Sequence, residues 1–63
     1  MNIGERLYYW RNLKQTSVYK LSKISGVSEN HIRNLENGKK QPTIKTLQAI
    51  TDGLNITLSE FFN

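Results

Sequence analysis

Residues 26–39, GVSENHIRNLENGK, hold the side chains of this chain that are best suited to molecular recognition. If Ile32 points inward on a helix, a rotation of about 100° per residue places Asn30 and Asn34 nearly opposite it, with Arg33 alongside. An Asn side chain can pair with adenine through two hydrogen bonds, and an Arg side chain can pair with guanine in the same way. This face can therefore read bases, although two amides are also compatible with ordinary solvated surface.

Two further polar residues on this segment have less certain roles. Glu29 can accept a hydrogen bond from cytosine, but an acidic residue in the first turn of a helix also complements the helix dipole. His31, the only histidine of the chain, suits a helix surface and can touch a phosphate or a base. Both readings of each residue stay open at this point.

Metal and catalytic sites are not expected. A single histidine without Cys or a nearby group of carboxylates does not make a metal site. The five acidic residues are scattered, the serines fall mostly at expected helix starts, and the chain has no glycine-rich phosphate loop. We therefore expect neither an enzyme nor a bound cofactor.

The length and charge of the chain limit the size of its fold and the kinds of partner that it suits. A chain of 63 residues is expected to form one domain, 1–63, with a small core. Its formal net charge of +4 is compatible with a nucleic-acid partner but does not require one. The chain has no Cys, no apolar run of membrane-spanning length and no recognisable signal peptide, so the expected location is the cytoplasm and no membrane partner is expected.

Apolar spacing and capping residues predict five short helices and no strand. The first covers about residues 3–14, with Ile3, Leu7 and Trp10 as its apolar stripe. The second and fourth are expected near 18–25 and 44–54, after the predicted N-caps Ser17 and Thr43, and the third near 28–37, with Ser28 as its cap. A last short helix is expected after Thr57, which forms a predicted capping box with Glu60. Short helices are marginal alone, so one shared core must hold them together. The fold class is therefore an all-α five-helix bundle.

The segment from Ser17 to Asn37 reads as helix, glycine turn, helix. Gly26 suits a left-handed turn, and Ser22 and Ser25 are small enough to let two helices cross closely. Such an arrangement is typical of the helix-turn-helix, in which the second helix enters the major groove of DNA.

Nearly the whole chain resembles the Cro/phage-repressor type of helix-turn-helix, the xenobiotic-response-element family. The resemblance lies in GVS at the start of the predicted recognition helix, LENGK at its end, the Pro-x-x-x-x-Leu approach to the fourth helix, and the ending LNITLSEFF. It implies five helices, a homodimer on an approximately palindromic operator of double-stranded DNA, and control of transcription.

The resemblance also implies roles for individual residues. The implied base contacts are Glu29, Asn30, Arg33 and Asn34, with His31 nearby. The implied phosphate contacts are Ser17, the amide at the start of the second helix near Val18, Asn37, Lys39 and Lys40, to which the hydroxyl of Tyr19 can be added. Arg11 and Glu36 match an ion pair that ties the first and third helices together.

Two positions depart from the family pattern. Val18 stands where the family usually has a Gln that contacts phosphate, which removes one expected contact. Gln15-Thr16 replaces the common Gly-Leu, and we expect Leu13 to fill the core volume lost at Thr16.

The C-terminal apolar residues exceed what a small core requires. Ile56, Leu58, Phe61 and Phe62 suggest a self-association patch, although the two Phe rings can equally close the core. The first helix cannot bury both Tyr8 and Tyr9 beside Trp10, so at least one is expected to be exposed.

The sequence favours a DNA-binding transcriptional regulator, most simply a repressor that occupies its operator as a dimer. A second hypothesis is a protein-interaction module on the same fold, such as an antitoxin, with a protein partner and secondary DNA binding. A third is a basic domain that coats nucleic acid without sequence preference.

Overall fold

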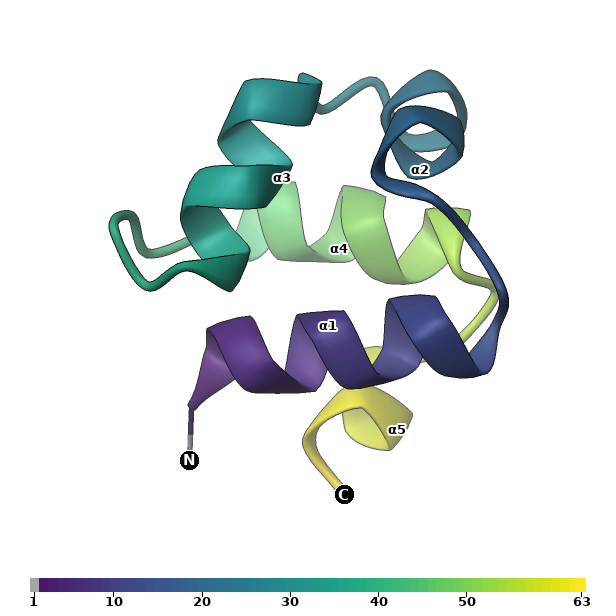
Figure 1. Cartoon of the computed structure of the whole chain (residues 1–63). Coiled ribbons are helices and arrows are strands. Elements are labelled where there is room, and N and C mark those ends of the chain that lie inside the picture. Colours follow the sequence, from purple (N-terminus) through teal and green to yellow (C-terminus); the bar gives the residue numbers. More distant parts are fainter. Residues whose placement is uncertain (1) are drawn as a thin grey trace.

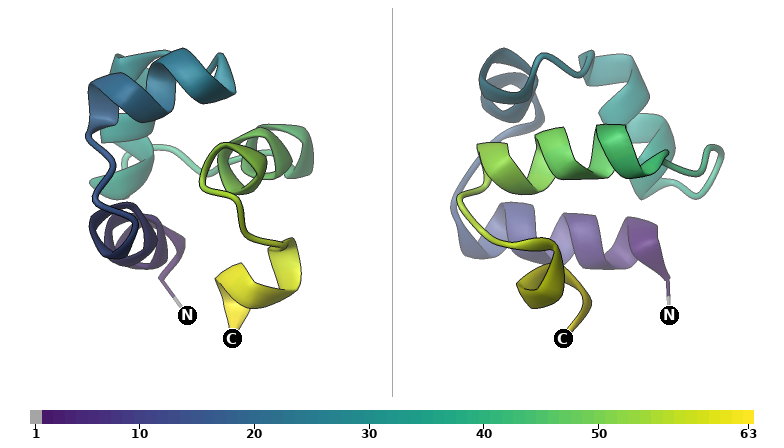
Figure 2. Two further views of the ribbon diagram at one scale, coloured as in Figure 1. Left: turned by 90° about the vertical axis from the view of Figure 1, so that its right-hand side faces the viewer. Right: turned by 180° about the vertical axis from the view of Figure 1, so that it is seen from behind.

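The computed structural model describes residues 2–63, and in that range its regular secondary structure consists of helices alone. Its five helices follow one another as α1 (Ile3–Leu13), α2 (Val18–Ser25), α3 (Glu29–Glu36), α4 (Ile44–Gly53) and α5 (Leu58–Phe62). Helices α1, α2 and α3 lie together, with α1 and α2 both in contact with α3, and α4 and α5 lie beside them (Figures 1 and 2). The predicted all-α architecture of five helices is confirmed.

Each helix begins at a side chain that accepts a hydrogen bond from a backbone N–H in the first turn. The predicted caps Ser17, Ser28, Thr43 and Thr57 all do so, over 3.0–3.1 Å. Thr57 and Glu60 form a complete capping box. The cap of α1 is Asn2, which the sequence analysis did not identify. A cap satisfies backbone donors that have no intrahelical partner, so these residues fix where each helix starts.

Two of the breaks between helices use left-handed backbone, which the sequence predicted at Gly26. Gly26 follows α2 with φ 77°, and Asn55 follows α4 with φ 60°. Glycine adopts this conformation without strain, and Asn tolerates it better than most residues. These residues allow α3 and α5 to leave in new directions.

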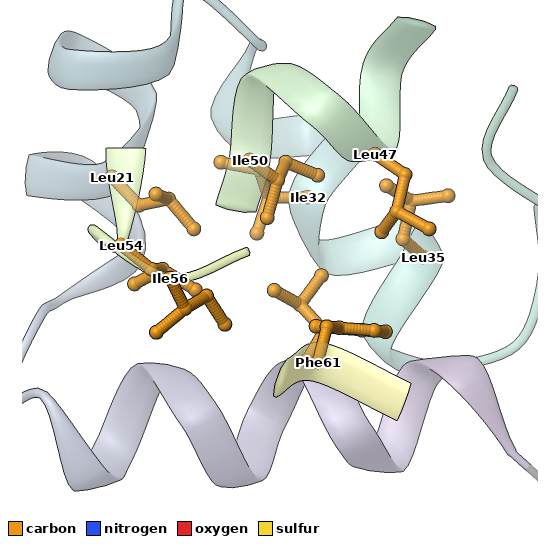
Figure 3. Packing of buried hydrophobic residues seen from close by; sticks show 9 residues of the cluster. Leu21, Ile32, Leu35, Leu47, Ile50, Leu54, Ile56 and Phe61 are labelled. Carbon is orange, nitrogen blue, oxygen red and sulfur yellow. The ribbon is translucent and has the colours of Figure 1, made fainter. Parts of the chain in front are cut away.

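Nine buried apolar side chains form the core, and every helix contributes at least one (Figure 3). They are Leu7, Leu21, Ile32, Leu35, Leu47, Ile50, Leu54, Ile56 and Phe61. The partly buried residues Ile3, Trp10, Val18, Val27 and Leu58 pack against this cluster. Burial of these side chains is the main force that holds such short helices together.

The structure corrects several expectations about apolar residues. Ile56 and Phe61 are buried in the core and do not belong to a surface patch, because α5 folds back onto α1 and α4. Leu13 is exposed and fills no core volume, since it lies about 240° around α1 from Leu7. Ile44, the first residue of α4, is 71% exposed.

Gly4 allows the start of α1 to touch the end of α3. A Cβ atom at this position would lie 2.5 Å from the carbonyl oxygen of Leu35 and 2.7 Å from that of Glu36. Any larger residue would therefore collide with backbone. The close approach sets the position of α3 relative to α1.

Candidate nucleic-acid interface

Helices α2 and α3 form the predicted helix-turn-helix. Gly26, Val27 and Ser28 connect them, and the two helices run in clearly different directions while remaining in contact (Figure 1). Ser25 accepts a hydrogen bond from the backbone N–H of Val27 over 3.2 Å, which stabilises the turn. The turn thereby sets the direction of α3.

Helix α3 is anchored from its inner side. Ile32 and Leu35 are fully or nearly fully buried against the core. On the opposite side Asn30 and Arg33 are exposed, and Asn34 and His31 are half-buried. The inner side thus holds the helix rigidly, while the outer side presents amides and a guanidinium to solvent.

One edge of this outer face contains a hollow of about 300 Å³. It is lined by Ser28, Asn30, His31, Asn34 and Lys40. The hollow is open to solvent and brings a lysine from the following loop next to the amides of the helix. The family resemblance implies a phosphate contact for Lys40, and the sequence pattern predicts a capping role for Ser28. Neither indicates that these residues lie beside Asn30.

The position of Lys40 follows from the backbone after α3. The backbone N–H groups of Lys39 and Lys40 both donate to the carbonyl oxygen of Asn34, over 2.9 and 3.3 Å. Gly38, with φ 77°, makes the necessary left-handed turn. The two lysines are thus held close to the C-terminal end of α3. The glycine followed by two lysines is the signal in the sequence that could have indicated this arrangement.

The other edge of the outer face carries a pair of charges. The Nη1 atom of Arg33 lies 3.4 Å from Oε1 of Glu29, one turn earlier on the helix. Both side chains are well exposed, at 56% and 40% respectively. Their i,i+4 spacing is the signal in the sequence that could have indicated this pair.

The start of α2 offers further donors. The hydroxyl oxygen of Ser17 is occupied by the N–H of Lys20, and helix geometry leaves the N–H groups of Val18 and Tyr19 without an intrahelical partner. The side chain of Val18 packs against the core, so only its backbone can face a ligand. The ring of Tyr19 is exposed, and the ammonium group of Lys23 lies 5.2 Å from its centre.

An ion pair fixes the C-terminal end of α3 to α1. The Nε atom of Arg11 donates to Glu36 over 2.7 Å, and its Nη2 atom donates to the second carboxylate oxygen over 3.1 Å. The third contact of the guanidinium is the carbonyl oxygen of Thr16. The side chains of the pair are only 13% and 10% exposed. The hydrogen bond to Glu36 raises the pKa of Arg11 above its ordinary value, against the opposing effect of burial.

A second arginine of α1, which the sequence analysis missed, fastens α5. Arg6 donates from Nε to the carbonyl oxygen of Phe61 over 2.8 Å and from Nη2 to that of Asn63 over 2.7 Å. Its guanidinium also lies 5.5 Å from the ring centre of Tyr9. These contacts join residues at opposite ends of the chain, and no local pattern in the sequence indicates them.

Positive charge is concentrated in the part of the chain that contains this interface. Seven of the nine basic residues fall within residues 14–45, together with only two of the five acidic residues. The remaining residues carry two basic and three acidic side chains. A polyanion is therefore attracted mainly toward the half of the sequence that builds α2, α3 and the following loop.

Residues 2–63 contain no group of three or more His, Asp or Glu side chains arranged to hold a metal ion. None of the helices in this range combines the length and the apolar character that a bilayer-spanning helix needs.

Comparisons with known proteins agree with the geometry. The sequence profile of the family described as Helix-turn-helix matches residues 7–61. The HTH-type transcriptional regulator PuuR of Escherichia coli (strain K12) is 33% identical over 60 residues, as is its counterpart of the same name in Shigella flexneri. Each match covers 95% of this chain but only 32% of the relative, so the chain spans about a third of the length of these proteins. No solved structure gives a significant match.

The profile covers α2, the glycine turn and α3, the elements that the structure shows as a helix-turn-helix. The chain therefore belongs to the Cro/phage-repressor type of helix-turn-helix family, a family of DNA-binding domains.

Proposed function

We propose that residues 1–63 form a single DNA-binding domain that regulates transcription by inserting α3 into the major groove of a specific site. The observation that carries this proposal is the division of α3 into two faces. Ile32 is completely buried, whereas Asn30 and Arg33 on the outer face are exposed. A rigid helix with amide and guanidinium groups on its free side has the side chains that direct base recognition uses.

Base recognition in this proposal comes from the outer face and its two edges. Asn30 and Asn34 are placed to pair with adenine, and Arg33 with guanine. His31 flanks them and contacts a neighbouring base, and Glu29, for which the resemblance also implies a base contact, lies beside Arg33. Each good bidentate pair contributes about 1–3 kcal/mol of discrimination against the wrong base, so two or three pairs supply useful specificity.

Phosphate contacts surround α3 and fix its register on the duplex. The proposed groups are Ser17, the backbone N–H of Val18, Tyr19, Asn37, Lys39 and Lys40. The first three lie at the start of α2, where free N–H groups and the helix dipole favour an anion. The last three follow α3 directly. Contacts on both sides of the recognition helix would hold it at a fixed angle.

We further propose that two copies bind an approximately palindromic operator and repress transcription by occupying it. Two of the four residues expected in the self-association patch remain available, because Phe62 is 38% exposed and Leu58 is only partly buried. Tyr9 on α1 is exposed and contacts Arg6, which itself binds the end of α5. A symmetric dimer that binds such an operator needs its two copies of α3 about 34–36 Å apart, one turn of B-DNA. A regulator of this kind acts in the cytoplasm.

Selection of bound sites from a pool of random duplexes tests the proposal. We expect the wild-type protein to enrich two inverted half-sites whose centres are about 10 base pairs apart. Enrichment of no sequence would refute specific recognition, and enrichment of isolated half-sites would refute the dimer.

The same selection with Asn34→Ala tests the assigned readout. The variant should lose its preference at one base pair of each half-site and keep the others, since one side chain is removed from a helix that is otherwise unchanged. Gln48→Ala, which removes an exposed amide from α4, should leave the selected sequence as in the wild type. Identical selected sequences for Asn34→Ala and the wild type would show that Asn34 does not read a base.

A second candidate is a protein-interaction module, such as an antitoxin, in which DNA binding is secondary. The observation that favours it is the exposure of Tyr8, Tyr9 and Leu13 on α1. These large apolar side chains lie outside the helix-turn-helix and contribute nothing to the proposed DNA contacts.

A further inference from the structure

The pair formed by Glu29 and Arg33 poses a problem for a surface that must attract DNA. A carboxylate at the start of the recognition helix repels phosphate, and here it also binds the guanidinium that is assigned to guanine. The contact joins Oε1 of Glu29 to Nη1 of Arg33 over 3.4 Å. The acidic residue precedes the basic one by four positions, which is the more favourable orientation for such a pair on a helix.

The contact uses only part of the guanidinium. An arginine side chain carries five N–H groups, and the bond to Glu29 engages Nη1 alone. The edge formed by Nε and Nη2 stays free to donate two parallel hydrogen bonds to O6 and N7 of a guanine. Arg33 can therefore keep its contact with Glu29 while it reads a base.

Phosphate places a different demand on the same cation. A phosphate group is negatively charged, so it competes with the Glu29 carboxylate for Arg33 and is repelled by that carboxylate as well. A guanine edge carries no formal charge and offers two acceptors in a fixed geometry. The pair of Glu29 and Arg33 can persist when Arg33 binds guanine, but it must be broken or weakened when Arg33 binds phosphate. The pair therefore favours the specific complex over the non-specific complex.

We propose that Glu29 is a specificity-determining residue that acts through Arg33, by withholding the guanidinium from phosphates while leaving it free to bind guanine. This inference rests on the proposed function, because it presupposes that Arg33 reads a base. It assigns to Glu29 a positioning role in place of direct recognition of cytosine. The main consequence is weaker binding to random DNA.

Binding of Glu29→Gln to a random duplex and to the selected operator, measured by fluorescence anisotropy over a range of salt concentrations, tests the inference. We expect the affinity of the variant for random duplex to rise about threefold to tenfold, because Arg33 gains a phosphate contact. The log–log salt slope for random duplex should become steeper by about one. Affinity for the operator should change much less, so the ratio of specific to non-specific affinity should fall several-fold.

Two further variants separate this role from a general charge effect. Asp52→Asn makes the same change in net charge at an exposed position of α4, and it should leave both the slope and the affinity ratio unchanged. In an Arg33→Gln background the substitution Glu29→Gln should no longer change the ratio, because the group on which it acts is absent. Melting curves should show all variants folded, since both residues of the pair are exposed.

Several results would overturn the inference. An unchanged affinity ratio in Glu29→Gln would show that Glu29 does not affect specificity. An equal effect of Asp52→Asn would show that Glu29 contributes only its charge. A changed base preference at a cytosine position, persisting without Arg33, would show direct reading by Glu29. If the wild-type protein prefers no sequence at all, the proposed function itself fails. If the wild type has an operator but the ratio does not respond to Glu29→Gln, only this inference fails.

Discussion

Arg11 connects three parts of the molecule through one guanidinium. It donates to both carboxylate oxygens of Glu36 and to the carbonyl oxygen of Thr16, and it lies 5.5 Å from the ring centre of Tyr8. The orientation of the C-terminal end of α3 therefore depends on a side chain that belongs to α1. Because the pKa of Arg11 is raised in the folded state, this stabilisation is fully present below its ordinary value and is lost only in strongly alkaline solution.

At the residue scale we predict that Glu36→Gln lowers the free energy of unfolding by about 3–5 kcal/mol, because it leaves a largely buried guanidinium without its counter-charge. Urea denaturation followed by circular dichroism measures this change. Arg33→Gln removes an ion pair of the same type from an exposed site and should cost less than about 0.5 kcal/mol. Equal losses in the two variants would mean that burial does not strengthen the pair between Arg11 and Glu36.

At the scale of the elements, the contact between α1 and α3 depends on a residue without a side chain. The end of α3 approaches so closely that its carbonyl oxygens occupy the space of a Cβ atom at Gly4. The same helix also holds α5 through Arg6. Helix α1 thus acts as the support on which both the recognition helix and the C-terminal helix are positioned.

Gly4→Ala should lower the free energy of unfolding by about 1–3 kcal/mol, because α1 and α3 must move apart to admit the methyl group. Helix propensity predicts the opposite sign, since Ala is favoured over Gly inside a helix by about 1 kcal/mol. Chemical denaturation of the variant distinguishes the two effects, because the collision lowers the free energy of unfolding and helix propensity raises it. A stabilised variant would show that the close approach of the two helices is not maintained in solution.

At the scale of the whole molecule, charge and apolar surface are distributed unevenly. Basic residues gather in the sequence that builds α2, α3 and the loop that follows α3. The exposed Phe62 and the neighbouring Leu58 lie on α5, across α4 from the helix-turn-helix (Figure 2). The proposed DNA-binding surface and the proposed self-association surface are therefore built from different helices.

The double variant Lys39→Gln, Lys40→Gln separates the regulator from a protein-interaction module. If both lysines contact phosphate, the log–log salt slope of operator binding should become shallower by about two. Titrations at several salt concentrations measure the slope, and Lys45→Gln on α4 provides a control with a smaller expected effect. An unchanged slope in the double variant would indicate that the loop after α3 does not dock on DNA.

The helices themselves were predictable because their signals are local. The caps at Ser17, Ser28, Thr43 and Thr57 act on backbone groups three residues later, and the apolar spacing repeats every three or four residues. The outward direction of Asn30 and Asn34 followed from the same periodicity. The pairing of Arg11 with Glu36 is present in the structure, but only the family resemblance implied it.

What the sequence determined by itself is thus the set of helices, their starting points and the polar face of α3, since each depends on contacts within one turn. The tertiary structure decided which apolar residues are buried, so that Phe61 closes the core while Phe62 stays exposed. It also placed Lys40 beside Asn30 and brought Arg6 to the end of α5, fifty-five residues later. These contacts join segments that are distant along the chain, and their geometry is set only when all five helices pack together.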